Sequence, residues 1–259
     1  MQTFFEIMKQ EDLIQLLEQI APPEIADDFD NGRIGLILDL LYTKNRNIQK
    51  IAVTLDVTDA VLQKAANFGA DLLICHHTPL FHPIMVIPED LAKRLKIAFD
   101  NNISIYAMHT NYDNAEGGIN TVLADMFGLK KTFMTDFGII GTVDPIETET
   151  FVKTVSEKLN APLLYAGDKT IRKVMICGGS CLNRHALSIA KANGVDAFLS
   201  SELKHSDVLR ERGDMTIIDA GHYATENPGM RVLAQRLKTE IGDKVVILFI
   251  DDNPELKSI

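Results

Sequence analysis

The chain has 259 residues, 46% of them hydrophobic and 24% charged, a composition that excludes intrinsic disorder and fibrous structure. Asp and Glu outnumber Lys and Arg by 36 to 26, so no overall positive field exists to attract nucleic acid or an anionic membrane. The longest apolar run, Val245–Ile250, is far shorter than the roughly 18 residues of a membrane-spanning helix. We expect a soluble protein without membrane contact, to which nucleic acid would bind only through a metal ion or a local basic cleft.

The N-terminus and the cysteines both point to a cytoplasmic protein. Met1–Gln10 contains Glu6 and Lys9 and lacks a small-residue cleavage site, which argues against a secretory signal. The three cysteines are too few, and odd in number, for a disulfide framework. We therefore expect a reduced, cytoplasmic protein.

The first half of the chain alternates helical and extended patterns. Apolar residues at helical spacing between Glu11 and Ile20 predict a helix that Pro22 and Pro23 end. Strands are then predicted over Lys50–Val57, Asp71–Cys75 and Ile103–Met108, with helices over Thr58–Asn67 and Glu89–Asn101 between them. This alternation is typical of an α/β fold with a mainly parallel sheet covered on both faces.

A change of rhythm after Gly128 predicts a second α/β lobe. A helix is expected over Ile146–Leu159, and strands over Gly138–Val143, Arg172–Gly178, Ala197–Ser200 and Met215–Ala220. Val245–Ile250 is the last strand, and its apolar character predicts a central position in a sheet.

Four histidines lie at the ends of predicted strands. His76 and His77 come after Asp71–Cys75, His109 follows Ile103–Met108, and His222 follows Met215–Ala220 after one glycine. Because the carboxyl ends of parallel strands lie at one edge of a sheet, where ligands bind, we expect these side chains to converge.

Two of these histidines have a carboxylate four residues later. His109 is followed by Asp113, and His222 by Glu226, a spacing that places His222 and Glu226 on one face if the segment is helical. Imidazole and carboxylate together select zinc, iron, manganese or cobalt, whereas calcium and magnesium prefer oxygen ligands. The pattern predicts a metal site.

The adjacent histidines complicate a single site, because neighbours on a strand point to opposite faces. His76 and His77 can share a site only where the strand ends, and one solution is that each binds a different ion. Together with His222, Asp113 and Glu226 they exceed the ligand set of one open catalytic ion. Two ions about 3.5–4 Å apart, bridged by Asp113, account for the set.

The ligand set also predicts the domain layout. His222 and Glu226 must reach the ions held by Asp113, so the chain has to leave the first lobe and return to it. We assign residues 1–127 plus 220–259 to a discontinuous metal-binding lobe and residues 128–219 to an inserted second α/β lobe.

Three blocks of the sequence resemble the signature blocks of the Nif-three-like family, also known as the GTP cyclohydrolase I type 2 homologues. The blocks are Ile74–Phe81, His109–Asn120 and Asp219–Glu226. The segments Asp12–Pro23 and Phe29–Leu36 are similar to the start of that family, so the resemblance covers nearly the whole chain.

The resemblance implies a dinuclear metal site in a cleft between two α/β lobes, in a subunit of a toroidal homohexamer. The family's ligand pattern falls on His76, His77, Asp113, His222 and Glu226. The chain departs from the family at Thr78, where proline or glycine is common, and at Asn31–Gly35, which is longer and more charged. Both departures would alter the shape of the cleft, and so the substrate, without touching the ligands.

Three further features have competing interpretations. His109 either moves a proton beside the metal ions, as our candidate catalytic residue, or caps the end of its strand. Glu202 and His205 are candidate substrate-binding residues, against a helix start capped by Ser201. Cys177–Cys181 could bind an anion through backbone N–H groups, but close packing at its glycines, with cysteines as small hydrophobes, explains it better.

Two functions follow from the metal site. The first is a metal-dependent hydrolase, cyclohydrolase-like or phosphoesterase-like, in which two divalent ions, zinc, iron or manganese, activate water against a nucleotide or phosphoester. The second is a non-enzymatic metal-handling or regulatory protein. Both functions need the same ligands, so the sequence does not separate them.

Overall fold

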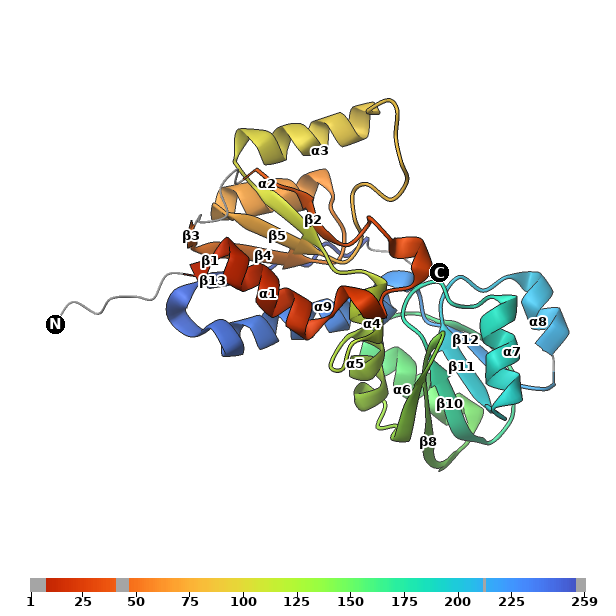
Figure 1. The fold of residues 1–259 in the computed structure, drawn as a ribbon. Coiled ribbons are helices and arrows are strands. Elements are labelled where there is room, and N and C mark those ends of the chain that lie inside the picture. The colour runs from red at the N-terminus through yellow and green to blue at the C-terminus, as the bar shows by residue number, and fades with distance from the viewer. Residues whose placement is uncertain (1–7, 41–46, 212, 255–259) are drawn as a thin grey trace. The chain divides into compact units, whose positions relative to one another are not determined.

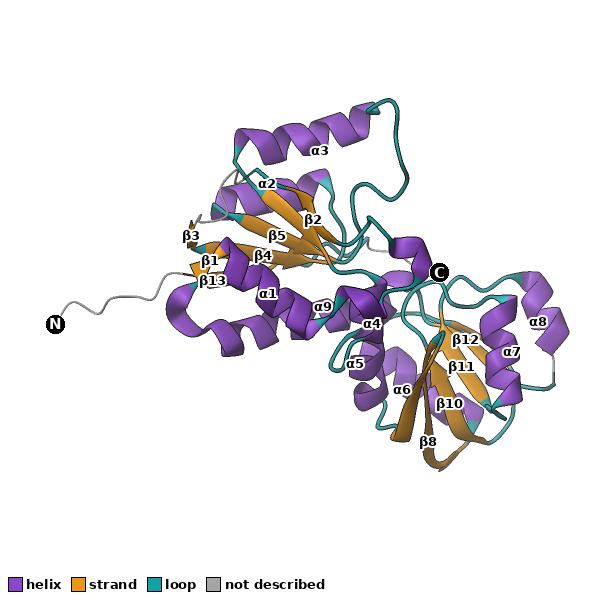
Figure 2. Cartoon of the chain, viewed as in Figure 1, coloured by secondary structure: helices purple, strands orange, loops and turns teal. Residues whose placement is uncertain are grey.

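The structure is a computed structural model that describes residues 8–40, 47–211 and 213–254. The chain divides into two compact units (Figure 1). Unit 1 comprises the described residues up to Glu116 together with Met230–Asn253, and unit 2 comprises Gly117–Gly229 together with Pro254. Each unit combines a β-sheet with helices (Figure 2), which confirms the α/β fold class.

Unit 1 is built on a five-stranded sheet in the order β13-β4-β5-β6-β2. Its pairings are parallel except for β2, which runs antiparallel to β6. The strands are β2 (Gly35–Leu38), β4 (Lys50–Thr54), β5 (Leu72–Cys75), β6 (Ser104–Ala107) and β13 (Val246–Phe249), and a separate pair is formed by β1 (Met8–Lys9) and β3 (Asn47–Ile48). The helices are α1 (Gln10–Ile20), η1 (Pro23–Ile25), η2 (Asp28–Asp30), α2 (Asp59–Phe68), α3 (Glu89–Asp100), α4 (Thr110–Asn114) and η3 (Gly242–Lys244).

Local signals explain where the helix α2 begins and ends. The Thr58 hydroxyl accepts a hydrogen bond from the Val61 amide at 3.1 Å, which caps the first turn. Gly69 then adopts a left-handed conformation with φ of 77° and ends the helix. The apolar face of α2 packs in one cluster with Ala52, Leu73 and Ile105, which are paired neighbours on three adjacent strands. Helices α2 and α3 cover this face, and α1 and the later part of α9 lie along the other (Figure 1).

Unit 2 is built on a six-stranded sheet in the order β7-β8-β10-β11-β12-β9. Its central strands β10, β11 and β12 are parallel, and its outer pairings are antiparallel. The strands are β7 (Lys130–Thr135), β8 (Gly138–Ile146), β9 (Leu164–Ala166), β10 (Ile171–Ile176), β11 (Ala197–Ser200) and β12 (Thr216–Asp219). The helices are α5 (Ile119–Met126), α6 (Thr148–Leu159), α7 (Arg184–Ala192), α8 (His205–Glu211) and the first part of α9 (His222–Ile241).

The structure corrects three sequence-based expectations about the sheets. β13 lies at an edge of its sheet, not at the centre, and its Val246 is exposed. The short strands β2, β7 and β9 escape the sequence patterns, and the three outer antiparallel pairings make the sheet of unit 2 mixed. An apolar run thus shows that a strand is present but does not give its place in the sheet.

The position of the unit boundaries matters for the candidate ligands. The two units meet in sequence at Glu116/Gly117 and again at Gly229/Met230, within α9. His222 and Glu226 therefore lie in the part of α9 that belongs to unit 2. None of the described helices is both long and apolar enough to cross a membrane.

Candidate metal centre

The carboxyl edge of the unit 1 sheet gathers three of the candidate residues. Asp56 follows β4, His76 and His77 follow β5, and His109 follows β6, and these three strands are adjacent and parallel. One ring nitrogen of each of His76, His77 and His109 lies within 4.8 Å of the others. The expected convergence of histidines at a sheet edge is therefore found within unit 1.

The two adjacent histidines share this edge because the strand ladder ends at them. The amides of His76 and His77 both donate to the carbonyl of Leu55, at 3.1 and 3.0 Å. Two successive amides on one carbonyl break the alternation of a strand, and the ring centroids lie only 4.9 Å apart. Because the strand ends here, the two adjacent side chains do not have to point to opposite faces of the sheet.

Each histidine of the pair has its Nδ1 held by an acceptor. His76 Nδ1 lies 2.8 Å from the carbonyl oxygen of Met108, and His77 Nδ1 lies 2.7 Å from Asp56 Oδ1. An Nδ1–H that donates to a carbonyl or carboxylate fixes the ring and leaves Nε2 with the lone pair, as in metal-bound histidines. Asp56, which the sequence analysis did not single out, is therefore a positioning residue for His77.

Asp113 faces His76 in the same unit. His76 is fully buried, and its Nε2 lies 3.7 Å from Asp113 Oδ1. Because the proton of a neutral His76 is on Nδ1, both facing atoms carry lone pairs. Two such atoms facing each other are suited to share a metal ion.

His109 is paired with a buried carboxylate that the sequence analysis missed. His109 Nδ1 lies 2.8 Å from Asp30 Oδ2, and Asp30 also accepts from the amide and the hydroxyl of Thr110. Burial would raise the pKa of the Asp30 carboxyl, but the hydrogen bonds from His109 and Thr110 outweigh burial and hold it below its ordinary value. Asp30 is thus ionised and orients the His109 ring.

The antiparallel strand β2 explains how Asp30 reaches His109. Gly35, the first residue of β2, pairs with Ala107, the last residue of β6. The turn η2, which precedes β2, is thereby placed beside the carboxyl end of β6. No local pattern links two residues that are 79 positions apart, and the only signal was that Asp30 lies within the resembling segment Phe29–Leu36.

In unit 2, His222 and Glu226 form a second pair at the start of α9. His222 Nε2 lies 3.1 Å from Glu226 Oε2, as the spacing of one helical turn predicts. His222 Nδ1 lies 2.7 Å from Glu202 Oε1. If Nδ1 carries the proton, His222 Nε2 and the facing Glu226 Oε2 both carry lone pairs, as His76 and Asp113 do in unit 1. Glu202, our candidate substrate-binding residue, contacts His222 from a left-handed backbone conformation with φ of 64°.

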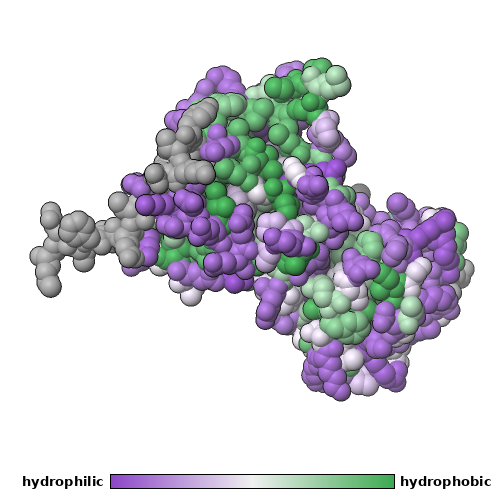
Figure 3. Space-filling view, in the orientation of Figure 1, coloured by the Kyte–Doolittle hydropathy of each residue, from purple (hydrophilic) through white to green (hydrophobic). Residues whose placement is uncertain are grey.

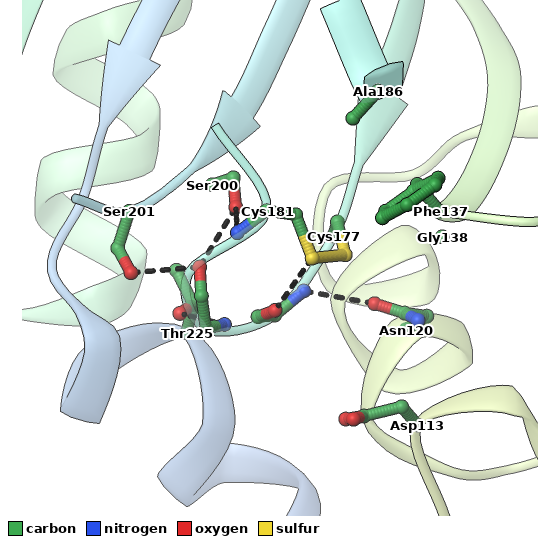
Figure 4. Close-up of a disulfide and its surroundings, with 12 residues drawn as sticks. Asp113, Asn120, Phe137, Gly138, Cys177, Cys181, Ala186, Ser200, Ser201 and Thr225 are labelled. Carbon is green, nitrogen blue, oxygen red and sulfur yellow. Dashed lines mark hydrogen bonds between the residues drawn. A yellow bond between two sulfur atoms is a disulfide. The ribbon is translucent and has the colours of Figure 1, made fainter. Parts of the chain in front are cut away.

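The glycine-rich turn after β10 packs against this pair. Gly179 has a φ of 67°, and a Cβ on it would lie 2.1 Å from Glu226 Oε1. Its amide donates to Thr225 Oγ1, and the amide of Gly178 donates to Asn120 Oδ1, as Figure 4 shows for the latter. These donors already have protein acceptors, so the turn shapes the carboxylate site and is not an anion-binding loop.

The cysteines of this turn differ from our expectation. Cys177 and Cys181 form a disulfide (Figure 4), where we expected reduced cysteines that pack as small hydrophobes. The sequence separation of four gave no clue, because the Gly-rich turn folds back between them. Cys75 is the free, buried cysteine, and its burial raises its pKa, so it remains a thiol.

The other predicted residues of unit 2 lie as follows. His205 is exposed at the start of α8, and the structure gives it no described partner in the site. Ser201 does not cap that helix, because α8 begins at His205 and the Ser201 hydroxyl donates to the carbonyl of Gly179 at 2.7 Å.

The donor set of each unit fits a divalent transition metal. Unit 1 offers imidazole nitrogens and the Asp113 carboxylate, and unit 2 offers the His222 imidazole and the Glu226 carboxylate. Nitrogen and oxygen donors of this kind suit zinc, iron and manganese. The held Nδ1 atoms of His76, His77 and His222 are what such ligands need.

Comparisons with known proteins show the family to which the chain belongs. The family model of Duf34/NIF3 (NGG1p interacting factor 3) matches residues 8–255. The chain is 30% identical to a "GTP cyclohydrolase 1 type 2 homolog" of Clostridium perfringens, over 92% of this chain and 94% of that protein. It is 29% identical to the protein of the same name from Methanocaldococcus jannaschii, over 93% and 99% of the two chains.

Solved structures are similar over nearly the full length. Reduced HcgD from Methanocaldococcus jannaschii superimposes with a TM-score of 0.83 at 27% identity, covering 95% of this chain and 99% of that one. A Bacillus cereus protein related to NIF3 has a TM-score of 0.86, covering 98% and 100% of the two chains, and its 18% identity makes it evidence for the fold alone.

Proposed function

Because the chain belongs to the Duf34/NIF3 family, whose relatives carry the name GTP cyclohydrolase 1 type 2 homolog, we propose that it is a metal-dependent hydrolase acting on a nucleotide or phosphoester. The observation that carries the proposal is the set of oriented imidazoles. His76, His77 and His222 each have Nδ1 on an acceptor, which prepares Nε2 as a ligand atom.

We further propose that His76, His77, Asp113, His222 and Glu226 hold two ions. The support is the donor count, since five ligands exceed what one open ion takes, and the resemblance of the three sequence blocks to the family. Zinc, iron and manganese are the candidate metals. When bound, two such ions would polarise the scissile bond and acidify the attacking water.

The protein's own contribution to the chemistry is the pair of His109 and Asp30. Asp30 holds the His109 ring through Nδ1, so His109 Nε2 is the atom that can take a proton from water and return it to the leaving group. The ionised Asp30 also stabilises the imidazolium form of His109 during the transfer. A site built only to store metal does not need this pair.

We also propose a homo-oligomer, with the toroidal hexamer of the resembling family as the expected assembly, in the cytoplasm. Exposed apolar side chains in the segment before α3, namely Ile84, Met85, Val86 and Ile87, support an interface between copies. Figure 3 shows hydrophobic residues gathered on the surface next to α3. Light scattering on the purified protein measures the number of subunits.

The experiment that tests the function is a turnover assay with metal analysis of the same samples. Protein loaded with zinc, manganese or iron is incubated with GTP, a phosphomonoester and a phosphodiester, and the products are separated by chromatography. We expect turnover that His77→Ala abolishes with loss of metal, and that His109→Gln abolishes with metal retained. Full metal occupancy without turnover on any substrate would instead identify a metal-handling protein.

A further inference from the structure

Two exposed phenylalanines and an arginine form a cluster in unit 1, which we call the aromatic platform: Phe29, Phe81 and Arg33. The ring centroids of Phe29 and Phe81 lie 6.5 Å apart, and the side chains are 50% and 39% exposed. The guanidinium carbon of Arg33 lies 4.5 Å from the centroid of Phe81 and 5.7 Å from that of Phe29. Large aromatic side chains left this open are typical of binding surfaces.

The platform borders the proposed proton-transfer residue. His109 meets both rings edge-on, with centroid distances of 5.7 Å to Phe81 and 6.1 Å to Phe29. The turn η2 places Phe29 beside His109, because it buries Asp30 against His109 while the neighbouring Phe29 is exposed. Phe81 follows the histidine pair in the same segment of chain. A molecule resting on the platform would therefore lie next to His109.

Arg33 supplies a positive charge at this place. The Arg33 guanidinium donates to the carbonyl oxygen of Phe29, which fixes it beside the rings. Among the described residues, no carboxylate lies within ion-pair distance of Arg33, although the chain carries a net charge of −10. A guanidinium has five N–H donors in a planar fork, and phosphate oxygens match that geometry.

We propose that the aromatic platform is the substrate-recognition site and that it selects a planar heterocycle bearing an anionic group, that is, a nucleotide. The rings of Phe29 and Phe81 stack with the base, and Arg33 binds the phosphate. The inference rests on the proposed hydrolase and deepens it, because a simple phosphoester would have no use for two aromatic rings.

The experiment is a calorimetric titration of the full-length, zinc-loaded protein with three probes: GMP, guanosine and ribose 5-phosphate. The three separate the two parts of the proposal, since guanosine lacks the charge and ribose 5-phosphate lacks the base. We expect GMP to bind about tenfold more tightly than either fragment. Failure of the wild-type protein to bind GMP would overturn the proposal.

Variants assign the binding to the platform. Phe81→Leu should weaken GMP and guanosine binding about tenfold and leave ribose 5-phosphate unchanged, because base stacking is lost. Arg33→Gln should weaken GMP and ribose 5-phosphate and leave guanosine unchanged. The matched controls are Phe99→Leu, whose ring is 50% exposed against 39% for Phe81, and Arg231→Gln, whose guanidinium carbon lies 4.7 Å from the Phe249 centroid. Both controls should bind as the wild type does.

Two outcomes would contradict the platform while leaving the hydrolase intact. The first is GMP binding that neither Phe81→Leu nor Arg33→Gln changes. The second is a Phe81→Leu variant with unchanged binding but fewer subunits by light scattering, which would show that a second copy of the chain covers these rings. Binding that follows the expected pattern without any turnover would instead contradict the hydrolase alone.

Discussion

The carboxyl edges of the two sheets are used differently. In unit 1, the edge carries the imidazoles themselves, since His76, His77 and His109 all follow parallel strands. In unit 2, β10 and β11 are followed by small residues, and the ligand candidates sit on the helix after β12. One sheet edge therefore presents donors directly, and the other shapes the surroundings of donors held by a helix.

The difference lies in how the donors are held. Side chains at the ends of unit 1 strands need partners from distant segments, such as Asp30 for His109 and Asp56 for His77. The pair of unit 2 also has a partner from another segment, since Glu202 lies 20 positions from His222, but the spacing of His222 and Glu226 is set by one helical turn. A helix thus fixes the spacing of two donors locally, whereas donors at the ends of different strands owe their spacing to strand pairing.

Asp113 is the residue whose replacement should lower metal content most. Asp113→Ala should reduce metal content to near zero, because a bridging carboxylate binds both ions, whereas His76→Ala and His77→Ala should each retain about half. Metal content of the dialysed protein, by mass spectrometry, gives the answer. Full occupancy in Asp113→Ala would exclude a dinuclear site bridged by this residue.

The next effect tests whether unit 2 depends on close packing. Gly179→Ala should destabilise the protein by clearly more than the cost of a left-handed backbone alone, because its Cβ would lie 2.1 Å from Glu226 Oε1. Gly194→Ala is the matched control, with a similar φ of 63° and no atom within 4 Å of its Cβ, and should cost about 1 kcal/mol. Equal losses in thermal unfolding would mean that Glu226 does not constrain Gly179.

Asp30→Asn should make the stability of the protein less dependent on pH in the acid range. Since the folded pKa of Asp30 is depressed, its stabilisation is present above the ordinary value of 3.8 and is lost as pH falls through the folded value. Metal-free Asp30→Asn should therefore be less stable by about 2 kcal/mol at neutral pH. Denaturant titrations should show this gap narrowing below pH 3.8, and a gap that is constant with pH would contradict an ionised Asp30.

The smallest effect compares the braces of the two units. Asp56→Asn in unit 1 and Glu202→Gln in unit 2 should each lower metal affinity about tenfold, because each weakens the hold on one histidine Nδ1. Competition with a chelator measures both. Asp59→Asn, an exposed carboxylate that pairs with Arg94 at 3.6 Å, should leave affinity unchanged. A loss in only one of the two units would show that only one histidine depends on its brace.

Short-range sequence patterns predicted the buried strands and the contacts within one helical turn. Apolar runs located β4, β5, β6, β10, β11 and β12, and one-turn spacing predicted the contact of His222 with Glu226. Strands β7 and β9 could not be found in this way, because most of their residues are exposed and each is held by a neighbouring strand. The edge position of β13 depends on pairing, which hydrophobicity does not report.

The candidate site likewise has a part that the sequence predicts and a part that it does not. The donor residues could be predicted, because histidine and carboxylate side chains are common metal ligands and they follow predicted strands. Their partners could not, because Asp30 and Asp56 lie 79 and 21 positions from the histidines they hold. The contact of Glu202 with His222 could not be predicted either, since nothing in the sequence shows that the backbone turns Glu202 towards His222.

The connectivity of unit 1 bears on how the chain is made. During synthesis the ribosome releases Gly117–Gly229, which carries the whole sheet of unit 2, before it releases β13. Until then β4 has no parallel neighbour on its outer side, although Ile51, Ala52 and Val53 are buried in the finished protein. The segment that carries His76 and His77 is thus translated early but completes its sheet last. In an unfinished chain the outer edge of β4 is therefore unpaired, and such an edge can pair with other chains and aggregate unless a chaperone covers it.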